Sequence, residues 1–147
     1  MRAVLQRVSS ASVTVDGEVT GKIAAGLVVL LGIAPEDTSA IVTTMAEKIL
    51  NLRIFHDDQK RMNRSLIDVA GAVLLISQFT LYADTRRGRR PGFNAAAPPD
   101  LARSLYHHMG AELSRQVPVE WGVFGAEMAV DLVNHGPVTI ILDSDDR

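Results

Sequence analysis

The clearest cluster of chemically functional side chains in this chain is basic, and its spacing is typical of a phosphate-binding site. Four arginines fall within five consecutive positions, with a glycine among them and a proline next: Arg86, Arg87, Arg89 and Arg90. A second and looser basic group contains Lys60, Arg61 and Arg64. Clusters of this kind can pair with phosphates while the rest of the surface stays acidic. Taken alone, the arginine cluster favours a solvated, mobile loop over a phosphate-binding site.

The common sequence signatures of a hydrolase are missing. There is no Gly-x-Ser-x-Gly elbow, no phosphate-binding glycine-rich loop and no His-Glu-x-x-His motif. Among four histidines, only His107 and His108 are adjacent, and on a predicted helix they point in different directions and cannot chelate one ion together. The chain has no cysteine, which excludes disulfides, thiolate metal sites and a cysteine nucleophile. We therefore expect no metal and no cofactor.

Composition predicts one packed domain, spanning residues 1–147, with 47% hydrophobic and 22% charged residues and a formal net charge of −2. No apolar run of about 18 residues is present, and residues 1–7 do not resemble a signal peptide. We expect a soluble cytoplasmic protein without a membrane partner. One tryptophan and few other aromatic residues argue against a base-stacking platform for single strands.

The elements that must position these residues begin with β-structure. Apolar and polar residues alternate in Ala11–Val15, and Asp16-Gly17 is a strong hairpin signal. Glu18–Ile23 is predicted to form the returning strand. The apolar run Leu27–Ile33 predicts a strand buried on both faces, and Ala72–Gln78 predicts another.

Two amphipathic helices are expected between the strands. Thr38 or Ser39 can cap the first helix, and Asp100 the second. Their apolar stripes are Ile41, Met45, Ile49 and Leu52 in the first, and Leu101, Leu105, Met109 and Leu113 in the second. Further strands are predicted at 53–56, 117–121, 128–133 and 138–142. This pattern predicts an α+β domain built on a β-barrel or a strongly bent sheet with two main helices.

Two short motifs carry more specific information. The first is Ser77-Gln78-Phe79-Thr80-Leu81, directly after a buried strand, and the second is Asn134-His135-Gly136-Pro137-Val138-Thr139, between the last two predicted strands. Together with the segments 2–8, 52–55, 88–93 and 124–128, they resemble the D-aminoacyl-tRNA deacylase family over nearly the full length. The family usually has Asp where this chain has His135.

The resemblance implies a homodimer that hydrolyses the ester of D-aminoacyl-tRNA, and of achiral glycyl-tRNA, to release the amino acid and tRNA. Ser77, Gln78, Phe79 and Thr80 would form the catalytic pocket. A cis Gly136-Pro137 pair from the other subunit would reject L-substrates by steric clash. Arg7 would support that loop.

The remaining roles follow from the same resemblance. Backbone N–H groups near Phe79 and Thr80 would stabilise the oxyanion, and the ribose 2′-hydroxyl would help activate water. Thr80 would orient groups and not act as the nucleophile. Phe124 and Met128 would lie near the terminal adenosine, although both are also ordinary core residue types. The four clustered arginines would meet tRNA phosphates.

Three alternatives stay open on the sequence. A related deacylase with a trans Gly-Pro bond would act on L-Ala-tRNA. A nucleic-acid-binding module would use the arginines without catalysis. A hydrolase of D-peptides or D-amino-acid esters would ignore RNA altogether.

Overall fold

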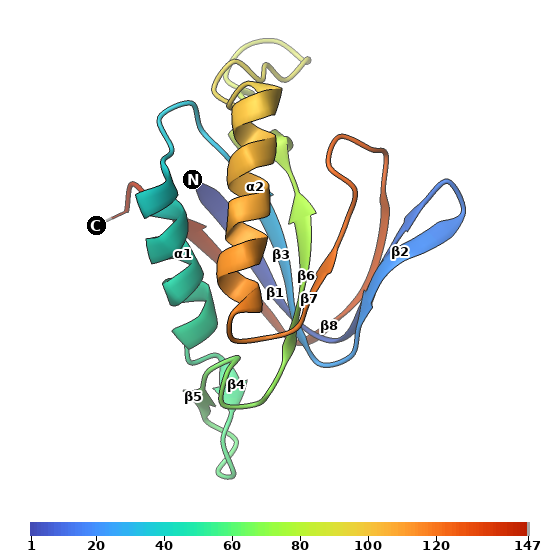
Figure 1. Cartoon of the computed structure of the whole chain (residues 1–147), viewed down its shortest axis with the longest axis vertical. Coiled ribbons are helices and arrows are strands. Elements are labelled where there is room, and N and C mark those ends of the chain that lie inside the picture. Colours follow the sequence, from blue (N-terminus) through green and yellow to red (C-terminus); the bar gives the residue numbers. More distant parts are fainter. Residues whose placement is uncertain (147) are drawn as a thin grey trace.

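The computed structural model describes residues 1–146, which form a curved sheet with two helices on one face (Figure 1). The strands are β1 (Arg2–Val15), β2 (Glu18–Ile23), β3 (Gly26–Gly32), β4 (Phe55–His56), β5 (Met62–Arg64), β6 (Ala72–Ser77), β7 (Val119–Trp121) and β8 (Ala129–Asp143). The helices are α1 (Ser39–Asn51) and α2 (Pro99–Ser114), with a 3₁₀ turn, η1, at Phe79–Tyr82. Neither helix within residues 1–146 is long and apolar enough to cross a membrane.

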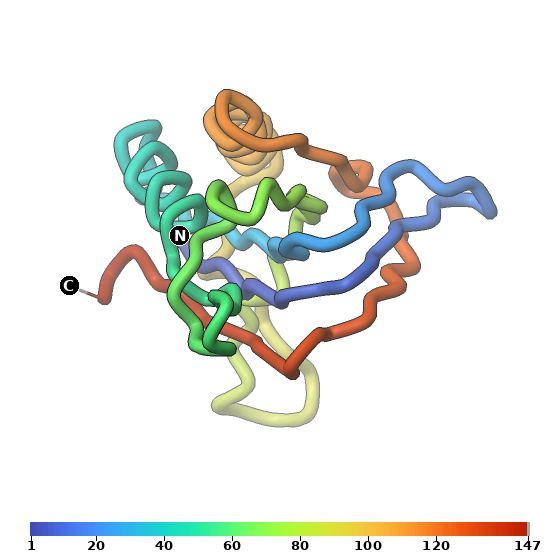
Figure 2. Tube along the Cα trace, turned by 90° about the horizontal axis from the view of Figure 1, so that it is seen from below, coloured from blue at the N-terminus to red at the C-terminus, as the bar shows by residue number. Residues whose placement is uncertain are grey.

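The long strand β1 organises the sheet, whose order is β2-β1-β3-β6-β7 with β8 also paired to β1. The first half of β1 pairs with β3, its second half pairs with β2, and β8 follows almost its whole length. Within the described part of the chain, the parallel pairs are β3–β6 and β6–β7. Because β1 changes partner along its length, the sheet bends strongly, and β2 returns toward β7, as Figure 2 shows from below. The predicted α+β class with a bent, barrel-like sheet and two helices is confirmed.

Two apolar clusters fill this architecture, one on each side of the bend. The larger lies between the sheet and the helices, and its fully buried members include Leu5, Leu31, Ile49, Leu75 and Met109. The smaller lines the inside of the bend with Val8, Ala11, Val13, Ile23, Val28, Leu74 and Ile76. The near-continuous apolar runs of β3 and β6 are thereby explained, since both faces of these strands are covered.

The helix starts differ in part from expectation. At α1 the prediction is confirmed, because the Thr38 side chain accepts a hydrogen bond from the Ile41 N–H at 3.4 Å. At α2 it is wrong: Pro98 is the flanking residue, Pro99 begins the helix and Asp100 lies in the first turn. Proline suits the first helical position because its φ is already helical and its missing N–H would have no helical partner.

The strands contain one confirmed turn and two corrections. The Asp16-Gly17 hairpin is confirmed, with positive φ of 50° and 80°. The strand expected at 53–56 is only Phe55–His56. The last two predicted strands are one strand, β8, with register shifts against β1 around Val8. Within the described residues β8 pairs only with β1, and an edge strand tolerates Pro137 because one side of its backbone needs no ladder hydrogen bond.

Candidate active site

The first motif forms the turn that leaves β6 at its carboxyl end. The Gln78 N–H donates to the Leu31 carbonyl of β3 at 2.8 Å, which fixes the exit from the sheet. The first hydrogen bond of the turn runs from the Leu81 N–H to the Gln78 carbonyl at 3.2 Å. The N–H groups of Phe79 and Thr80 precede that bond, so the turn itself does not use them.

The side chains of this turn face the surface. Phe79 is 56% exposed, which is unusual for a phenylalanine, and Thr80 is exposed as well. The side-chain amide of Gln78 donates to the Thr80 hydroxyl oxygen. That contact leaves the Thr80 proton available for donation to a further acceptor. Sequence reasoning did not anticipate it, although residues two apart in a tight turn are natural partners.

The second motif lies in the middle of β8 and is held from below by a buried arginine. The Gly136-Pro137 peptide bond is cis, and both residues are exposed. Arg7 of β1 is only 3% exposed; its Nε donates to the His135 carbonyl at 3.0 Å and its Nη1 to the Ile54 carbonyl at 2.6 Å. The guanidinium thus joins the loop to the segment after α1, in the place that the resemblance implied for Arg7.

Strand register separates the two motifs within one chain. Gly136-Pro137 lies beside Arg7 of β1, which is level with Leu27 of β3 and therefore with Val73 of β6. Ser77 lies four residues further along β6 and three strand spacings away from β8. At roughly 3.3 Å per residue and 4.8 Å per strand, the separation is on the order of 15–20 Å. A single chain therefore does not bring Gly136-Pro137 to the Ser77–Thr80 turn.

Phe124 and Met128 lie on the segment that leaves β7. Since β7 runs parallel to β6, this segment and the first motif leave the sheet at the same edge. Phe124 contacts the Tyr106 ring of α2 at 5.7 Å between ring centroids and lies under the Arg103 guanidinium at 4.8 Å. Met128 packs, partly buried, against the smaller apolar cluster. Both residues lie near the edge from which the first motif leaves, and both also pack against the core, so their contact with the terminal adenosine stays a prediction.

The four clustered arginines occupy an exposed hairpin. Asp84 and Gly92 close it with two reciprocal backbone hydrogen bonds of 2.7 and 2.9 Å. The Asp84 carboxylate accepts from Arg86 Nε at 2.9 Å and Nη2 at 2.8 Å, and the guanidinium holds the pKa of that carboxyl well below its usual range. Arg87 and Arg90 line a neighbouring hollow of about 530 Å³. The sequence analysis treated the four arginines alike and did not predict that Asp84 pairs with Arg86. An aspartate two residues before an arginine in a turn could have indicated this pair.

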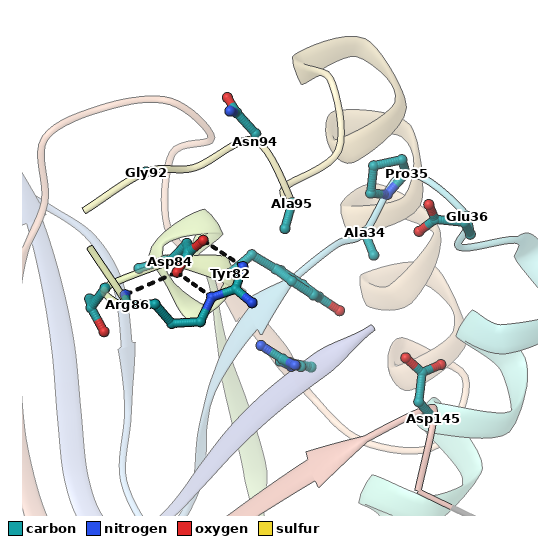
Figure 3. A pocket seen from close by; sticks show the side chains of 13 residues that line it. Ala34, Pro35, Glu36, Tyr82, Asp84, Arg86, Gly92, Asn94, Ala95 and Asp145 are labelled. Carbon is teal, nitrogen blue, oxygen red and sulfur yellow. Dashed lines mark hydrogen bonds and ion pairs between the residues drawn. The ribbon is translucent and has the colours of Figure 1, made fainter. Parts of the chain in front are cut away.

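A larger hollow of about 740 Å³ lies on the other side of this hairpin (Figure 3). Its walls include Arg2, Glu36, Tyr82, Asp84 and Asp145, so its charges are mixed. Neither motif lines it. We therefore assign the candidate site to the Ser77–Thr80 turn, where the distinctive residues are. Within residues 1–146, no group of three or more His, Asp or Glu side chains is arranged to hold a metal ion.

Comparison with known proteins agrees with the two motifs. Residues 4–143 match a family described as D-Tyr-tRNA(Tyr) deacylase. A D-aminoacyl-tRNA deacylase of Opitutus terrae is 58% identical and covers 100% of this chain and 99% of its own; one of Thermus aquaticus is 60% identical, with 100% and 97% covered.

Two solved structures share the fold. One described as c-Myc DNA Unwinding Element Binding Protein has a TM-score of 0.92 and 42% identity, covering 97% of this chain and 98% of its own. A probable eukaryotic D-amino acid tRNA deacylase has a TM-score of 0.83 at 17% identity, covering 96% and 97%, and shows the fold alone. Because the family match and the similar relatives extend over nearly the whole length, this chain belongs to the D-Tyr-tRNA(Tyr) deacylase family.

Proposed function

We propose that the protein is an aminoacyl-tRNA editing hydrolase that cleaves the ester between a D-amino acid and the terminal ribose of tRNA. Water adds to the ester carbonyl, the ribose oxygen leaves with a proton, and the products are free D-amino acid and tRNA. The observation that carries the proposal is the Ser77–Thr80 turn of a family member, with backbone donors and a positioned hydroxyl beside an exposed aromatic ring. Its place of action would be the cytoplasm, where aminoacyl-tRNA is used.

The chemistry assigned to the turn is electrostatic. As water attacks, negative charge grows on the carbonyl oxygen, and the N–H groups of Phe79 and Thr80 would stabilise it. Gln78 holds the Thr80 hydroxyl through its side-chain amide, which suits an orienting role. The substrate's own 2′-hydroxyl would help activate the water. The Phe79 ring, with Met128 and Phe124 at the same edge, would receive the terminal adenosine.

Thr80→Ala tests whether Thr80 orients groups or acts as the nucleophile. An orienting hydroxyl predicts a partial loss of kcat for D-Tyr-tRNA, because the backbone donors remain. A Thr80 nucleophile predicts complete loss of turnover with substrate binding intact and, in the wild type, a covalent aminoacyl-enzyme trapped by acid quenching. Detection of that adduct by mass spectrometry would replace the electrostatic scheme.

Rejection of L-substrates is assigned to Gly136-Pro137. A filter that must accept many D side chains has to read the α-carbon, and a rigid main-chain wall does so by colliding with an L side chain. Arg7, buried and bonded to the His135 carbonyl, supports such a fixed wall. A steric filter cannot refuse glycine, so free glycyl-tRNA should be hydrolysed at high enzyme concentration. Resistance of glycyl-tRNA to excess enzyme would contradict a purely steric filter.

The distance between the two motifs supports a homodimer as the working form. Since Gly136-Pro137 lies far from the Ser77–Thr80 turn of its own chain, the wall must come from a second copy if both act on one substrate. The exposed apolar residues of β8, Val133 and Ile141 at 56% and 74% exposure, support an interface along this strand.

The first experiment compares hydrolysis of D-Tyr-tRNA and L-Tyr-tRNA by the purified protein, with a chelator present. We expect rapid loss of the D-ester only. Cleavage of neither ester would remove the proposed activity, and equal cleavage of both would remove Gly136-Pro137 as the filter. Raising the salt concentration should weaken tRNA binding steeply, because the arginine hairpin would release counterions from the phosphates.

A second candidate function is nucleic-acid binding without catalysis. The description of the 42% identical structure as a DNA unwinding element binding protein favours it, and so does the exposed arginine hairpin. This candidate predicts salt-sensitive binding of tRNA or DNA with no hydrolysis of either tyrosyl ester. The same experiment therefore decides between the two functions.

A further inference from the structure

Two of the four phenylalanines meet on the surface, at the junction between the first motif and the arginine hairpin. The rings of Phe79 and Phe93 contact edge to face, with centroids 5.0 Å apart and an interplanar angle of 71°. Phe79 is 56% exposed and Phe93 is partly exposed. Contiguous exposed apolar surface can mark a ligand-binding site.

The hairpin fixes the position of Phe93. Gly92, its neighbour in the chain, is bonded through both backbone groups to Asp84, so Phe93 begins where the hairpin closes. Figure 1 shows this hairpin as the yellow loop above the end of β6, next to the start of α2. The aromatic pair is thus continuous with the Ser77–Thr80 turn on one side and with the arginines on the other.

The arginines of the hairpin differ in their surroundings. Arg86 is engaged by the Asp84 carboxylate through its backbone N–H and two side-chain nitrogens, a pair visible in Figure 3. Arg86 holds the pKa of the Asp84 carboxyl well below its usual range, so Asp84 stays ionised at neutral pH and its charge is balanced by Arg86. Arg87 and Arg90 line the hollow of about 530 Å³ with Asp84, Arg86 and Gly92. A hollow of that volume is within the range of small-ligand sites.

We propose that Phe93 and Arg90 form a subsite for the nucleotide that precedes the terminal adenosine of the substrate. Its base would stack against Phe93, and its phosphate would bind Arg90, with Arg87 beside it. The inference rests on the proposed function, because the terminal adenosine at Phe79 sets the direction of the RNA chain. A stacked base and a charge-paired phosphate are the two contacts by which proteins hold single-stranded nucleic acid. The low aromatic content argued against a stacking platform, but the fold brings two of the few aromatic rings together.

The test uses two substrates that differ only in the nucleotides before the terminal adenosine. One is adenosine esterified with D-tyrosine, without a 5′ phosphate, and the other is the trinucleotide CCA carrying the same ester. For the wild type we expect kcat/KM to be larger for the trinucleotide. Phe93→Ala and Arg90→Ala should each lower the trinucleotide value by about tenfold and leave the adenosine value nearly unchanged.

Three further variants separate recognition from structure. Phe93→Tyr keeps a stacking ring and should retain the trinucleotide preference, whereas Phe93→Leu keeps an apolar side chain and should lose it. Arg115→Ala removes a largely exposed arginine at the end of α2, outside the hairpin, and should change kcat/KM for neither substrate. Arg90→Ala should also reduce the salt dependence of the trinucleotide reaction by about one counterion.

Three results of these measurements would contradict the subsite or the proposed function. An equal loss on both substrates in Phe93→Ala would mean that Phe93 only supports Phe79, and the subsite would be withdrawn. A wild type without any preference for the trinucleotide would also overturn it. Failure of the wild type to cleave D-Tyr-tRNA would instead overturn the proposed function itself.

Discussion

At the scale of single residues, the buried Arg7 defines the geometry of the Gly136 loop. A side-chain cation that is 3% exposed needs partners, and Arg7 finds them in the carbonyls of His135 and Ile54. Gly136 has a φ of +127°, and a Cβ there would lie 2.7 Å from Arg7 Nη2. Because Arg7 is buried and bonded, it cannot move aside cheaply. Glycine is therefore required at position 136 for two reasons: other residues rarely adopt its positive φ, and a Cβ would clash with Arg7.

Gly136→Ala should lower kcat/KM for D-Tyr-tRNA by tenfold or more and reduce the preference for the D-ester, because the loop must shift away from Arg7. The measurement is hydrolysis of paired D- and L-Tyr-tRNA. Gly17→Ala is the matched control: it also has a positive φ, of 80°, but its Cβ would meet nothing within 4 Å. Both variants should lose about 1–3 kcal/mol of stability from backbone strain. Only Gly136→Ala should change turnover; full activity in that variant would contradict the assigned role.

At the scale of elements, α2 supports the edge of the sheet from which the first motif leaves. Tyr106 is 1% exposed, its hydroxyl donates to the Leu75 carbonyl of β6 at 2.9 Å, and its ring meets Trp121 of β7 at 5.5 Å between centroids. One side chain thus joins the helix to two parallel strands. Burial raises the pKa of Tyr106 to about 12, so its proton is retained in the folded state well above the ordinary tyrosine range.

Tyr106→Phe should cost about 1 kcal/mol of unfolding free energy at neutral pH, the usual net value of one hydrogen bond. Its pH dependence has a defined sign. Above about pH 10 the unfolded tyrosine loses its proton while the folded one keeps it, so wild-type stability falls from pH 10 toward pH 12. The variant should lose less stability over that range, as measured by urea unfolding. Burial also raises the pKa of Tyr82, so part of the alkaline loss should remain. An unchanged alkaline slope would contradict the assignment.

At the scale of the whole molecule, the distance between the two motifs supports the proposal that two copies share each site. One chain places Gly136-Pro137 and the Ser77–Thr80 turn three strands apart. In a two-fold dimer each site would take the turn from one copy and the Gly136 loop from its partner. The dimer would then be needed for chemistry as well as for covering apolar surface.

Mixing two strongly impaired variants tests this arrangement. One carries Phe79→Ala and Thr80→Ala, and the other carries Gly136→Ala. After joint refolding in equal amounts, half of the dimers should be mixed, and each mixed dimer should hold one intact site, giving about a quarter of wild-type activity. Each variant alone should stay at its own low level. If mixing gave no recovery, the site would lie within one chain. Sedimentation at assay concentration should show dimers throughout.

The class of fold, the cap of α1 and the family could all be predicted from the amino-acid sequence. Each of these depends on local patterns: alternating apolar residues, the Asp16-Gly17 turn, the Thr38 cap and two contiguous motifs. Local sequence patterns gave wrong predictions where a segment was compatible with two structures. Asn134–Thr139 read as a turn between strands, because glycine and proline usually interrupt a strand, and Asp100 read as a cap.

Which residues contact one another depends on the packing of the folded chain. Arg7 and His135 are 128 positions apart, and their bond exists because β1 and β8 are neighbours in the sheet. The contact between Phe79 and Phe93 depends on where the arginine hairpin closes, and the separation of roughly 15–20 Å between the motifs depends on strand order and register. Such relations follow from packing distant segments against one another, a non-local property that composition, periodicity and motif spacing do not encode.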